Sequence, residues 1–317
     1  MKNSFQLLCL TIFLLSCNSS GKNTNNQISP QIYQGPIIDM HIHAYNQEIG
    51  GMMFGMDHPN PLKNEMYKGV KTPEELKSAT FSKFDQHNIV VALTSDGQLW
   101  HEDDPERIYI SGRNMPLDQI RELHKTGKLK AIGELNPFYG GITADHESQK
   151  AFFDLAEELG VPVGFHVMPG GPPGAIYHLG MDEVRVANSN PRQLEEVLVS
   201  HPDLKVFVMH GGWPYLEDMK AMMYAHPQLY LDIAAIDWIL PAREFHKFLE
   251  GLVDAGFGNR IMFGSDQMVW PETIDIAIDA VNSADFLTYE QKEDIFYDNA
   301  AEFLGLSQEL ISQHKIN

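Results

Sequence analysis

The stretch GPIIDMHIHAYN, residues 35–46, runs from an apolar segment into alternating polar side chains. Asp39, His41 and His43 occupy every second position before the sequence becomes polar again. Alternate residues of a β-strand share one face, so the two imidazoles point the same way, about 6–7 Å apart along the chain. Unpaired polar groups are costly to bury. These side chains could therefore be core residues satisfied by neighbours, surface residues or ligands of a metal ion.

Seven further segments have the apolar, β-branched composition of short strands. With residues 36–44 they make eight candidate strands, the others being 88–95, 107–112, 129–135, 161–167, 204–210, 229–235 and 260–266. Segments with helical periodicity lie between most of them, at 72–87, 115–127, 148–160, 191–201, 216–226 and 243–256. The alternation predicts an α/β fold, a single-domain (β/α)8 TIM barrel. A doubly wound open sheet is the alternative, but no glycine-rich phosphate turn follows the first strand.

The connection from His43 to Pro73 is unusually long for a turn between a strand and a helix. It would follow the first strand, at the face of a barrel that carries active sites. Its methionines and glycines are typical of an adaptable, partly apolar lid. We therefore expect a loop that covers part of the site.

The carboxyl ends of the predicted strands carry acid or imidazole groups. These groups are Asp39, His41, His43, Glu134, His166, His210 and Asp266. In a (β/α)8 barrel all these ends converge on one face. Four of them offer the nitrogen and oxygen ligands of a catalytic zinc site: His41, His43, His166 and Asp266. Without thiolates, Mn²⁺ and Fe²⁺ are also compatible. Each residue alone could be structural, but together they predict a metal site.

The charge balance restricts the partners of the protein. The formal net charge is −20, whereas binding to nucleic acid or to an anionic membrane surface needs clustered lysine and arginine. Neither nucleic acid nor a polybasic membrane contact is therefore expected.

The N-terminus resembles a lipoprotein signal. An apolar run from Leu7 to Leu15 is too short to span a bilayer comfortably, so residues 1–16 are predicted to be a signal peptide. The run ends in LLSC, which is similar to the lipobox of bacterial lipoproteins. This resemblance implies cleavage before Cys17 and lipidation of its sulfur. An ordinary secretory signal is the alternative.

The residues after the signal predict how the domain is attached. Residues 17–34 are rich in Asn and Ser and read as a flexible tether, followed by the barrel at 35–317. We expect an exported bacterial lipoprotein on the periplasmic or outer-membrane side, whose membrane contact is the lipid anchor.

Six motifs, in order, carry a resemblance to a known family. They are DMHIHA, AIGEL, VGFHV, FVMHGGWP, IMFGSDQ and DNAAEFLGL, and together they span residues 37–306. The set resembles the amidohydrolase superfamily, specifically its amidohydrolase 2 branch of (β/α)8 barrels. The resemblance implies one divalent metal, zinc first, held by His41, His43, His166 and Asp266.

The resemblance also implies roles for two further residues. His210 is similar to a histidine that binds a second metal or acts near the substrate. Many binuclear relatives carry a carboxylated lysine at the end of the fourth strand, where this chain has Glu134. Glu134 is therefore an additional candidate ligand that could bridge a second metal, or a residue that supports the ligands without binding metal.

The function implied is metal-dependent hydrolysis of an amide, lactone or ester of a small molecule. Asp266 would transfer the proton and His210 would stabilise the developing oxyanion. Non-oxidative decarboxylation, found in the same branch, is the alternative, with Arg113 or Arg185 holding the carboxylate. A catalytically silent, lipid-anchored binding protein is a third interpretation, against which the complete ligand set argues.

Several residues on loops after the strands are candidates for substrate contact. Trp213 and Trp270 follow two of the polar strand ends, and His178 and Arg185 lie in the loop after the fifth strand. Each could equally pack against neighbouring loops. The sequence is compatible with an oligomer, and it does not identify the substrate.

Overall fold

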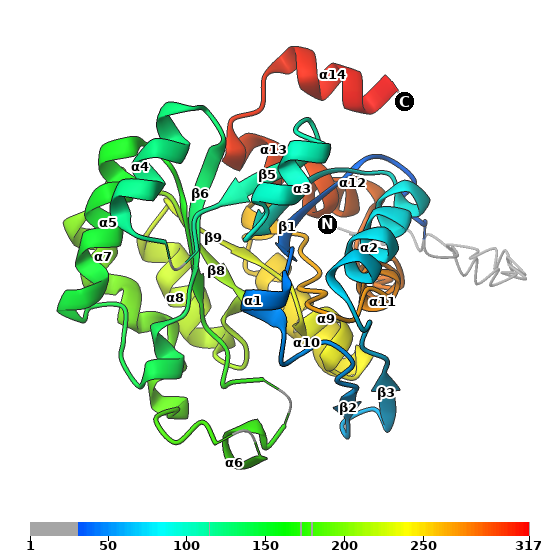
Figure 1. The fold of residues 1–317 in the computed structure, drawn as a ribbon, viewed down its shortest axis with the longest axis horizontal. Coiled ribbons are helices and arrows are strands. Elements are labelled where there is room, and N and C mark those ends of the chain that lie inside the picture. The colour runs from blue at the N-terminus through cyan, green and yellow to red at the C-terminus, as the bar shows by residue number, and fades with distance from the viewer. Residues whose placement is uncertain (1–30, 114, 172, 179, 317) are drawn as a thin grey trace, which may run out of the picture.

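The computed structural model describes residues 31–316 except 114, 172 and 179. Its main sheet has eight strands in the order β1-β4-β5-β6-β7-β8-β9-β10, and all neighbours are parallel (Figure 1). They are β1 (Ile37–His43), β4 (Ile89–Ser95), β5 (Ile108–Ser111), β6 (Leu129–Leu135), β7 (Val163–His166), β8 (Val206–Met209), β9 (Leu229–Asp232) and β10 (Ile261–Met262). Each lies within one of the eight predicted segments.

Backbone hydrogen bonds bring the last strand back to the first. Met40 N donates to Phe263 O at 3.0 Å, and Asp266 N donates to His41 O at 2.7 Å. These bonds nearly close the sheet into a barrel, and the predicted single-domain (β/α)8 fold is confirmed. They also place Asp266 beside His41, although the two residues lie near opposite ends of the domain's sequence.

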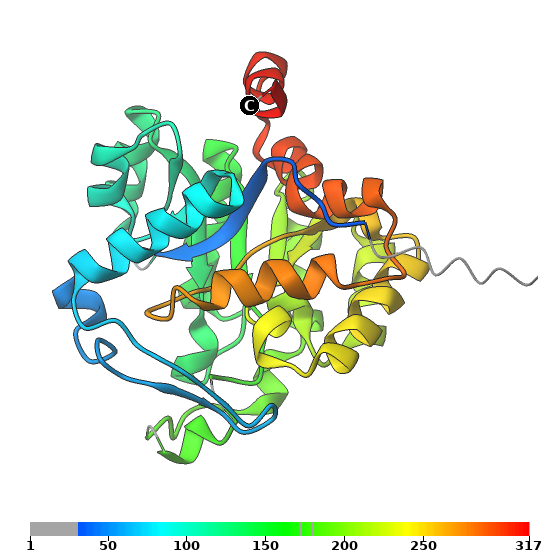
Figure 2. The ribbon, with the colours of Figure 1, turned by 90° about the vertical axis from the view of Figure 1, so that its right-hand side faces the viewer.

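Helices cover the outside of the sheet (Figures 1 and 2). The larger ones are α2 (Pro73–His87), α4 (Leu117–Lys125), α5 (Glu147–Leu159), α7 (Glu195–Ser200), α8 (Leu216–Ala225), α10 (Ala242–Asp254) and α11 (Thr273–Asn282). Shorter helices and the C-terminal ones are α1 (Gln47–Gly50), α3 (Gln98–Asp103), α6 (Ala175–His178), α9 (Ile236–Ile239), α12 (Tyr289–Glu293), α13 (Asn299–Leu304) and α14 (Gln308–Ile316).

Helix α2 shows how the sequence sets its ends. The Thr72 side chain caps the helix by accepting a hydrogen bond from Glu75 N at 3.1 Å, and Pro73 occupies the first turn. The helix stops at Asn88, which adopts a left-handed conformation with φ 54°. Leu76, on the face turned to the sheet, is fully buried.

The long connection after β1 is more ordered than the predicted loop. It contains α1 and an antiparallel hairpin of β2 (His58–Asn60) and β3 (Glu65–Tyr67). The hairpin region is fixed to the barrel by three hydrogen bonds: Val70 N to Val269 O at 3.0 Å, Asn60 Nδ2 to Ile239 O at 2.9 Å and Trp270 Nε1 to Met56 O at 2.8 Å. The connection is therefore a wall of the barrel with its own secondary structure, and its action as an adaptable lid stays a prediction.

The residues just before the predicted start of the barrel also pack on it. Tyr33 is buried and stacks on Phe296, with ring centroids 5.4 Å apart. The packed part of the chain therefore begins before residue 35. The predicted signal peptide, Cys17 and most of the tether lie outside the described residues. Within residues 31–316, no helix is long and apolar enough to cross a membrane.

Candidate metal centre

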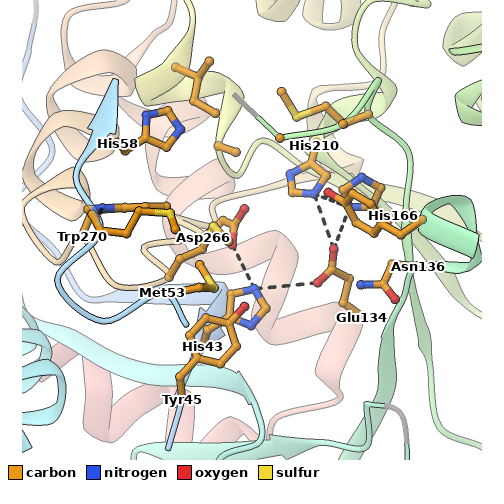
Figure 3. Close-up of a pocket in the computed structure, with 18 of the residues that line it drawn as sticks. His43, Tyr45, Met53, His58, Glu134, Asn136, His166, His210, Asp266 and Trp270 are labelled. Carbon is orange, nitrogen blue, oxygen red and sulfur yellow. Dashed lines mark hydrogen bonds and ion pairs between the residues drawn. The ribbon is translucent and has the colours of Figure 1, made fainter. Parts of the chain in front are cut away.

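Six polar side chains meet where the barrel strands end, and Figure 3 labels all of them except His41. They come from five strand ends: His41 and His43 from β1, Glu134 from β6, His166 from β7, His210 just after β8 and Asp266 just after β10. All six are buried, and Asp266 is the most accessible at 8%. The carboxyl ends of parallel strands share one face of a barrel, which explains why residues so distant in sequence converge.

One group of possible ligands consists of His41, His43 and Asp266. Asp266 Oδ1 lies 3.0 Å from His43 Nε2 and 3.7 Å from His41 Nε2. The three ligand atoms all lie within 4.8 Å of one another, so one ion could contact them together. The group combines two imidazoles with one carboxylate, as catalytic zinc sites do.

A second group consists of His41, Glu134 and His210, again with ligand atoms within 4.8 Å of one another. The Glu134 carboxylate lies between the two groups. Its Oε2 is 3.7 Å from His43 Nε2, and its Oε1 is 3.8 Å from His210 Nε2. Because His41 belongs to both groups, the two candidate sites overlap.

His166 lies beside the second group without joining either one. Its Nδ1 donates to Glu134 Oε1 at 2.6 Å and is 2.9 Å from His210 Nε2. Its Nε2 has no hydrogen-bond partner among the described residues. The role of His166 as a direct ligand stays a prediction, whereas its contact with Glu134 orients that carboxylate.

The unpaired atoms of the cluster test whether a metal fits. His41 Nε2, His43 Nδ1 and Asp266 Oδ1 are buried and make no hydrogen bond to any described residue. Such groups cost free energy in the interior unless a partner compensates them. A divalent cation compensates several at once, and imidazole with carboxylate suits zinc, manganese or iron. The residues present therefore fit a metal.

The charges of the cluster point the same way. Burial alone would raise the pKa of both carboxyl groups, but nearby imidazoles reverse the effect. Hydrogen bonding from His166 contributes to a pKa of Glu134 well below its ordinary value, and His41 contributes to a lowered pKa of Asp266. Burial lowers the pKa of His41, but Asp266 and other carboxylates outweigh it and bring that pKa to about 10. A bound metal ion would take the place of the His41 proton as the positive partner of these two carboxylates.

Two further carboxylates hold the ligands in place. Asp232, the last residue of β9, accepts from His210 N at 2.8 Å and places Oδ2 3.3 Å from His41 Nδ1. Asp39 Oδ1 accepts from His41 N and Ser265 N, both at 3.0 Å. Asp39 therefore supports His41 through the backbone and belongs to neither ligand group. Asp232 was missed, although it too ends an apolar strand, in LYLD.

Asp232→Asn is expected to lower the affinity for Zn²⁺ by about 10- to 100-fold, as is typical when the partner of a metal-binding histidine is changed. The charged acceptor opposite His41 Nδ1 is lost, while an amide oxygen can still accept from His210 N. Calorimetric titration of the chelated protein measures the change.

Asp237→Asn is the matched control for Asp232→Asn. Asp237 is also buried, but neither of its oxygens bonds a described residue, and burial raises its pKa well above the ordinary value. We expect unchanged Zn²⁺ affinity in this variant. Equal losses in both variants would show that Asp232 has no specific effect on His41.

A cavity of about 520 Å³ opens above the cluster. Its polar floor contains His43, Glu134, His166, His210 and Asp266. Most other lining residues are apolar or aromatic, and they include Met53, Met56, Met268, Trp238 and Trp270. An apolar cavity with a few polar groups at one end is the usual form of a small-molecule site.

The cavity contains one arginine among its described lining residues, Arg113. Its Nη2 donates to Asp96 Oδ2 at 2.7 Å, and its guanidinium lies 5.6 Å from the centre of the Tyr45 ring. Tyr45 in turn stacks on His43 at 4.8 Å. Arg113 is therefore fixed by an acid and an aromatic ring.

The predicted substrate-binding residues differ in whether they line the cavity. Trp270 lines the cavity. Trp213 packs against the hydrophobic core and is absent from the described lining. Arg185 is exposed and donates to Asp182 O and Val184 O, also away from the lining. His178 lies in α6, and its side chain is outside the described part of the structure.

The fold and the cluster define a (β/α)8 barrel with a candidate metal centre at its carboxyl face. The profile of the family named Amidohydrolase matches residues 38–306. The chain therefore belongs to the amidohydrolase family, as its motifs predicted. Enzymes of this family depend on metal, in agreement with the buried ligand groups.

Among curated proteins, the chain is similar to Protein fluG of Emericella nidulans, with 21% identity over 147 residues. The match covers 41% of this chain and 17% of the relative, so the chain spans less than a fifth of that protein's length.

Solved structures show the same fold at low sequence identity. A 5-carboxyvanillate decarboxylase from Sphingomonas paucimobilis matches with a TM-score of 0.60 and 12% identity, over 86% of this chain and 99% of the other. A probable 2-pyrone-4,6-dicarboxylic acid hydrolase from Acinetobacter baumannii matches with a TM-score of 0.57 and 14% identity, over 85% of this chain and 99% of the other. An amidohydrolase from Burkholderia multivorans with bound zinc matches with a TM-score of 0.55 and 14% identity, over 86% of this chain and 100% of the other. Hydrolases and decarboxylases thus share this barrel.

Proposed function

We propose that this protein is a metal-dependent hydrolase that cleaves an amide, lactone or ester bond of a small molecule. The observation that carries the proposal is the buried ligand set at the floor of a largely apolar cavity, with the Asp266 carboxylate facing that cavity. A divalent ion held there would lower the pKa of water toward neutrality and polarise a carbonyl oxygen. Zinc is the first candidate.

Asp266 is suited to transfer a proton. Its lowered pKa keeps it ionised at neutral pH, and its Oδ1 has no hydrogen-bond partner among the described residues. It can take the proton of the attacking water and return it to the leaving group.

His210 is held in one orientation at the cavity floor. Its Nδ1 donates to Ala234 O at 3.0 Å, which leaves Nε2 directed toward Glu134. In this position the neutral ring of His210 can bind the ion through Nε2, and the protonated ring can donate from Nε2 to the oxygen on which negative charge develops.

Decarboxylation of an aromatic acid is the alternative, and the likeness to a decarboxylase keeps it under test. Such a reaction benefits from a cation that binds the carboxylate. Of the two predicted candidates, Arg113 is already paired with Asp96, and Arg185 lies away from the described lining. This arrangement favours a neutral substrate and therefore hydrolysis.

A substrate panel on the chelated and zinc-reloaded protein tests the proposal. The panel contains lactones, esters, amides and aromatic carboxylic acids. Zinc-dependent release of acid without carbon dioxide supports the hydrolase, and release of carbon dioxide supports the decarboxylase. Zinc binding without turnover of any compound supports a silent binding protein.

We also propose that the protein is exported and anchored through lipid on Cys17. The proposal rests on the apolar run and the LLSC sequence. Labelling of expressing bacteria with radioactive palmitate tests it: the full chain should carry label, and Cys17→Ser should not. Label that persists in Cys17→Ser would contradict the assignment.

A further inference from the structure

The hairpin after β1 places a buried histidine in the wall of the cavity. This histidine belongs to neither ligand group of the metal centre. His58, the first residue of β2, lines the cavity and is 2% exposed. Its Nδ1 has no hydrogen-bond partner among the described residues. Buried polar atoms in proteins are nearly always paired, so an unpaired one in a cavity wall indicates a partner supplied by the ligand.

The ring of His58 packs against two indoles. It meets Trp270 edge to face with centroids 4.7 Å apart, and Trp238 with centroids 5.3 Å apart. Both indole N–H groups are already occupied: Trp238 Nε1 donates to Ser265 O at 2.6 Å and Trp270 Nε1 donates to Met56 O at 2.8 Å. The tryptophans therefore offer apolar faces to the cavity, and the imidazole beside them is a polar group of this wall.

Most of the wall around His58 is apolar. Met53, Met56 and Ile239 line the cavity with the two tryptophans. In Figure 3, His58, Trp270 and Met53 lie on one side of the site, and His166 and Asn136 lie on the other. A substrate with its reacting bond at the polar floor would thus place an apolar body against this wall and meet His58.

The charges around the cavity favour a neutral group on the ligand. Burial lowers the pKa of His58, so its imidazole is neutral at neutral pH and can exchange donor and acceptor roles by changing tautomer. Asp57, an acid outside both ligand groups, also lines the cavity. Arg113, which could attract an anion, is held by Asp96.

We propose that His58 recognises a neutral polar group, such as a hydroxyl, on a mostly apolar, ring-sized substrate. The inference rests on the proposed function in one respect, namely that the bond to be hydrolysed lies at the polar floor of the cavity. Recognition by His58 is a property of ligand binding and can be measured without turnover. A preference for a neutral polar group would distinguish this cavity from one that binds a dicarboxylate.

Binding of ketones that cannot be hydrolysed tests the inference. The probes are 1-acetylnaphthalene, its 5-, 6- and 7-hydroxy derivatives and its 5-carboxy derivative, titrated calorimetrically into the zinc-loaded protein. At least one hydroxy derivative should bind about 10-fold more tightly than the parent, as one buried hydrogen bond permits. The carboxy derivative should bind more weakly than the parent.

Two substitutions separate the hydrogen bond from the packing. His58→Phe keeps a ring against the indoles but removes Nδ1, and it should abolish the preference for the hydroxy derivative. His58→Asn keeps a polar atom near the position of Nδ1, and it should retain most of the preference while lowering the melting temperature.

Three results would overturn the inference: no binding of any neutral probe, equal binding of all neutral probes to the natural protein, or an unchanged hydroxy preference in His58→Phe. A preference that depends on His58 in a protein that hydrolyses no ester, lactone or amide would refute the proposed function alone. Hydrolysis without that preference would refute the role of His58 alone.

Discussion

Replacement of Asp266 by asparagine is expected to lower turnover by about 10²- to 10⁴-fold, the usual contribution of a general acid–base group. The amide cannot take a proton from water. The fold should remain intact, because Asp266 has φ 47° and asparagine adopts this left-handed conformation as readily as aspartate. Steady-state kinetics with a substrate found in the panel measures the effect.

Metal content must be measured in the same preparation, because Asp266 is also a candidate ligand. Lost turnover with zinc retained supports the proton-transfer role, and lost turnover with lost zinc assigns Asp266 to binding alone. Asp85→Asn, at an exposed pair with Arg107, is the control and should keep full turnover. Full turnover in Asp266→Asn would remove Asp266 from the mechanism.

Substitution of His41 is expected to abolish metal binding altogether, because His41 belongs to both ligand groups. His43→Asn disrupts the first group alone, and His210→Asn disrupts the second alone. Asparagine is chosen because His210 has φ 64°, a conformation that asparagine tolerates. Zinc per chain after dialysis, measured by mass spectrometry, distinguishes the sites.

The pattern of zinc content gives the number and position of the ions. One ion in the first group predicts loss of zinc in His43→Asn and retention in His210→Asn. Two ions predict a partial loss in each. His246→Asn is the control, since His246 bonds Ala280 O far from the cluster, and it should keep all zinc. Full zinc content in His41→Asn would contradict both ligand groups.

The barrel was predictable because short-range patterns in the sequence mark its strands and helices. Each strand is a short apolar run followed by a helix-period segment, and this alternation leaves few topologies. The convergence of His41 with Asp266 was also predictable, since strand ends of a barrel share a face. By the same rule Asp232 could have been found, because it too ends an apolar strand.

The walls of the cavity were not predictable, because tertiary contacts fix them. The β2 strand is three residues long and contains Pro59, so it has too few positions to show a period of two. His58 therefore had no signal in the sequence. Arg185 looked available for an anion, but its guanidinium donates to nearby backbone carbonyls. Such contacts depend on loop conformation rather than residue type.

The most direct test of a metal-dependent hydrolase is turnover of one active ester, lactone or amide by the protein before chelation, after chelation and after reloading with zinc. The ligand set predicts that chelation removes activity, that zinc restores it, and that acid forms without carbon dioxide. Undiminished hydrolysis by protein shown to be free of metal, or release of carbon dioxide as the product, would contradict the proposed function.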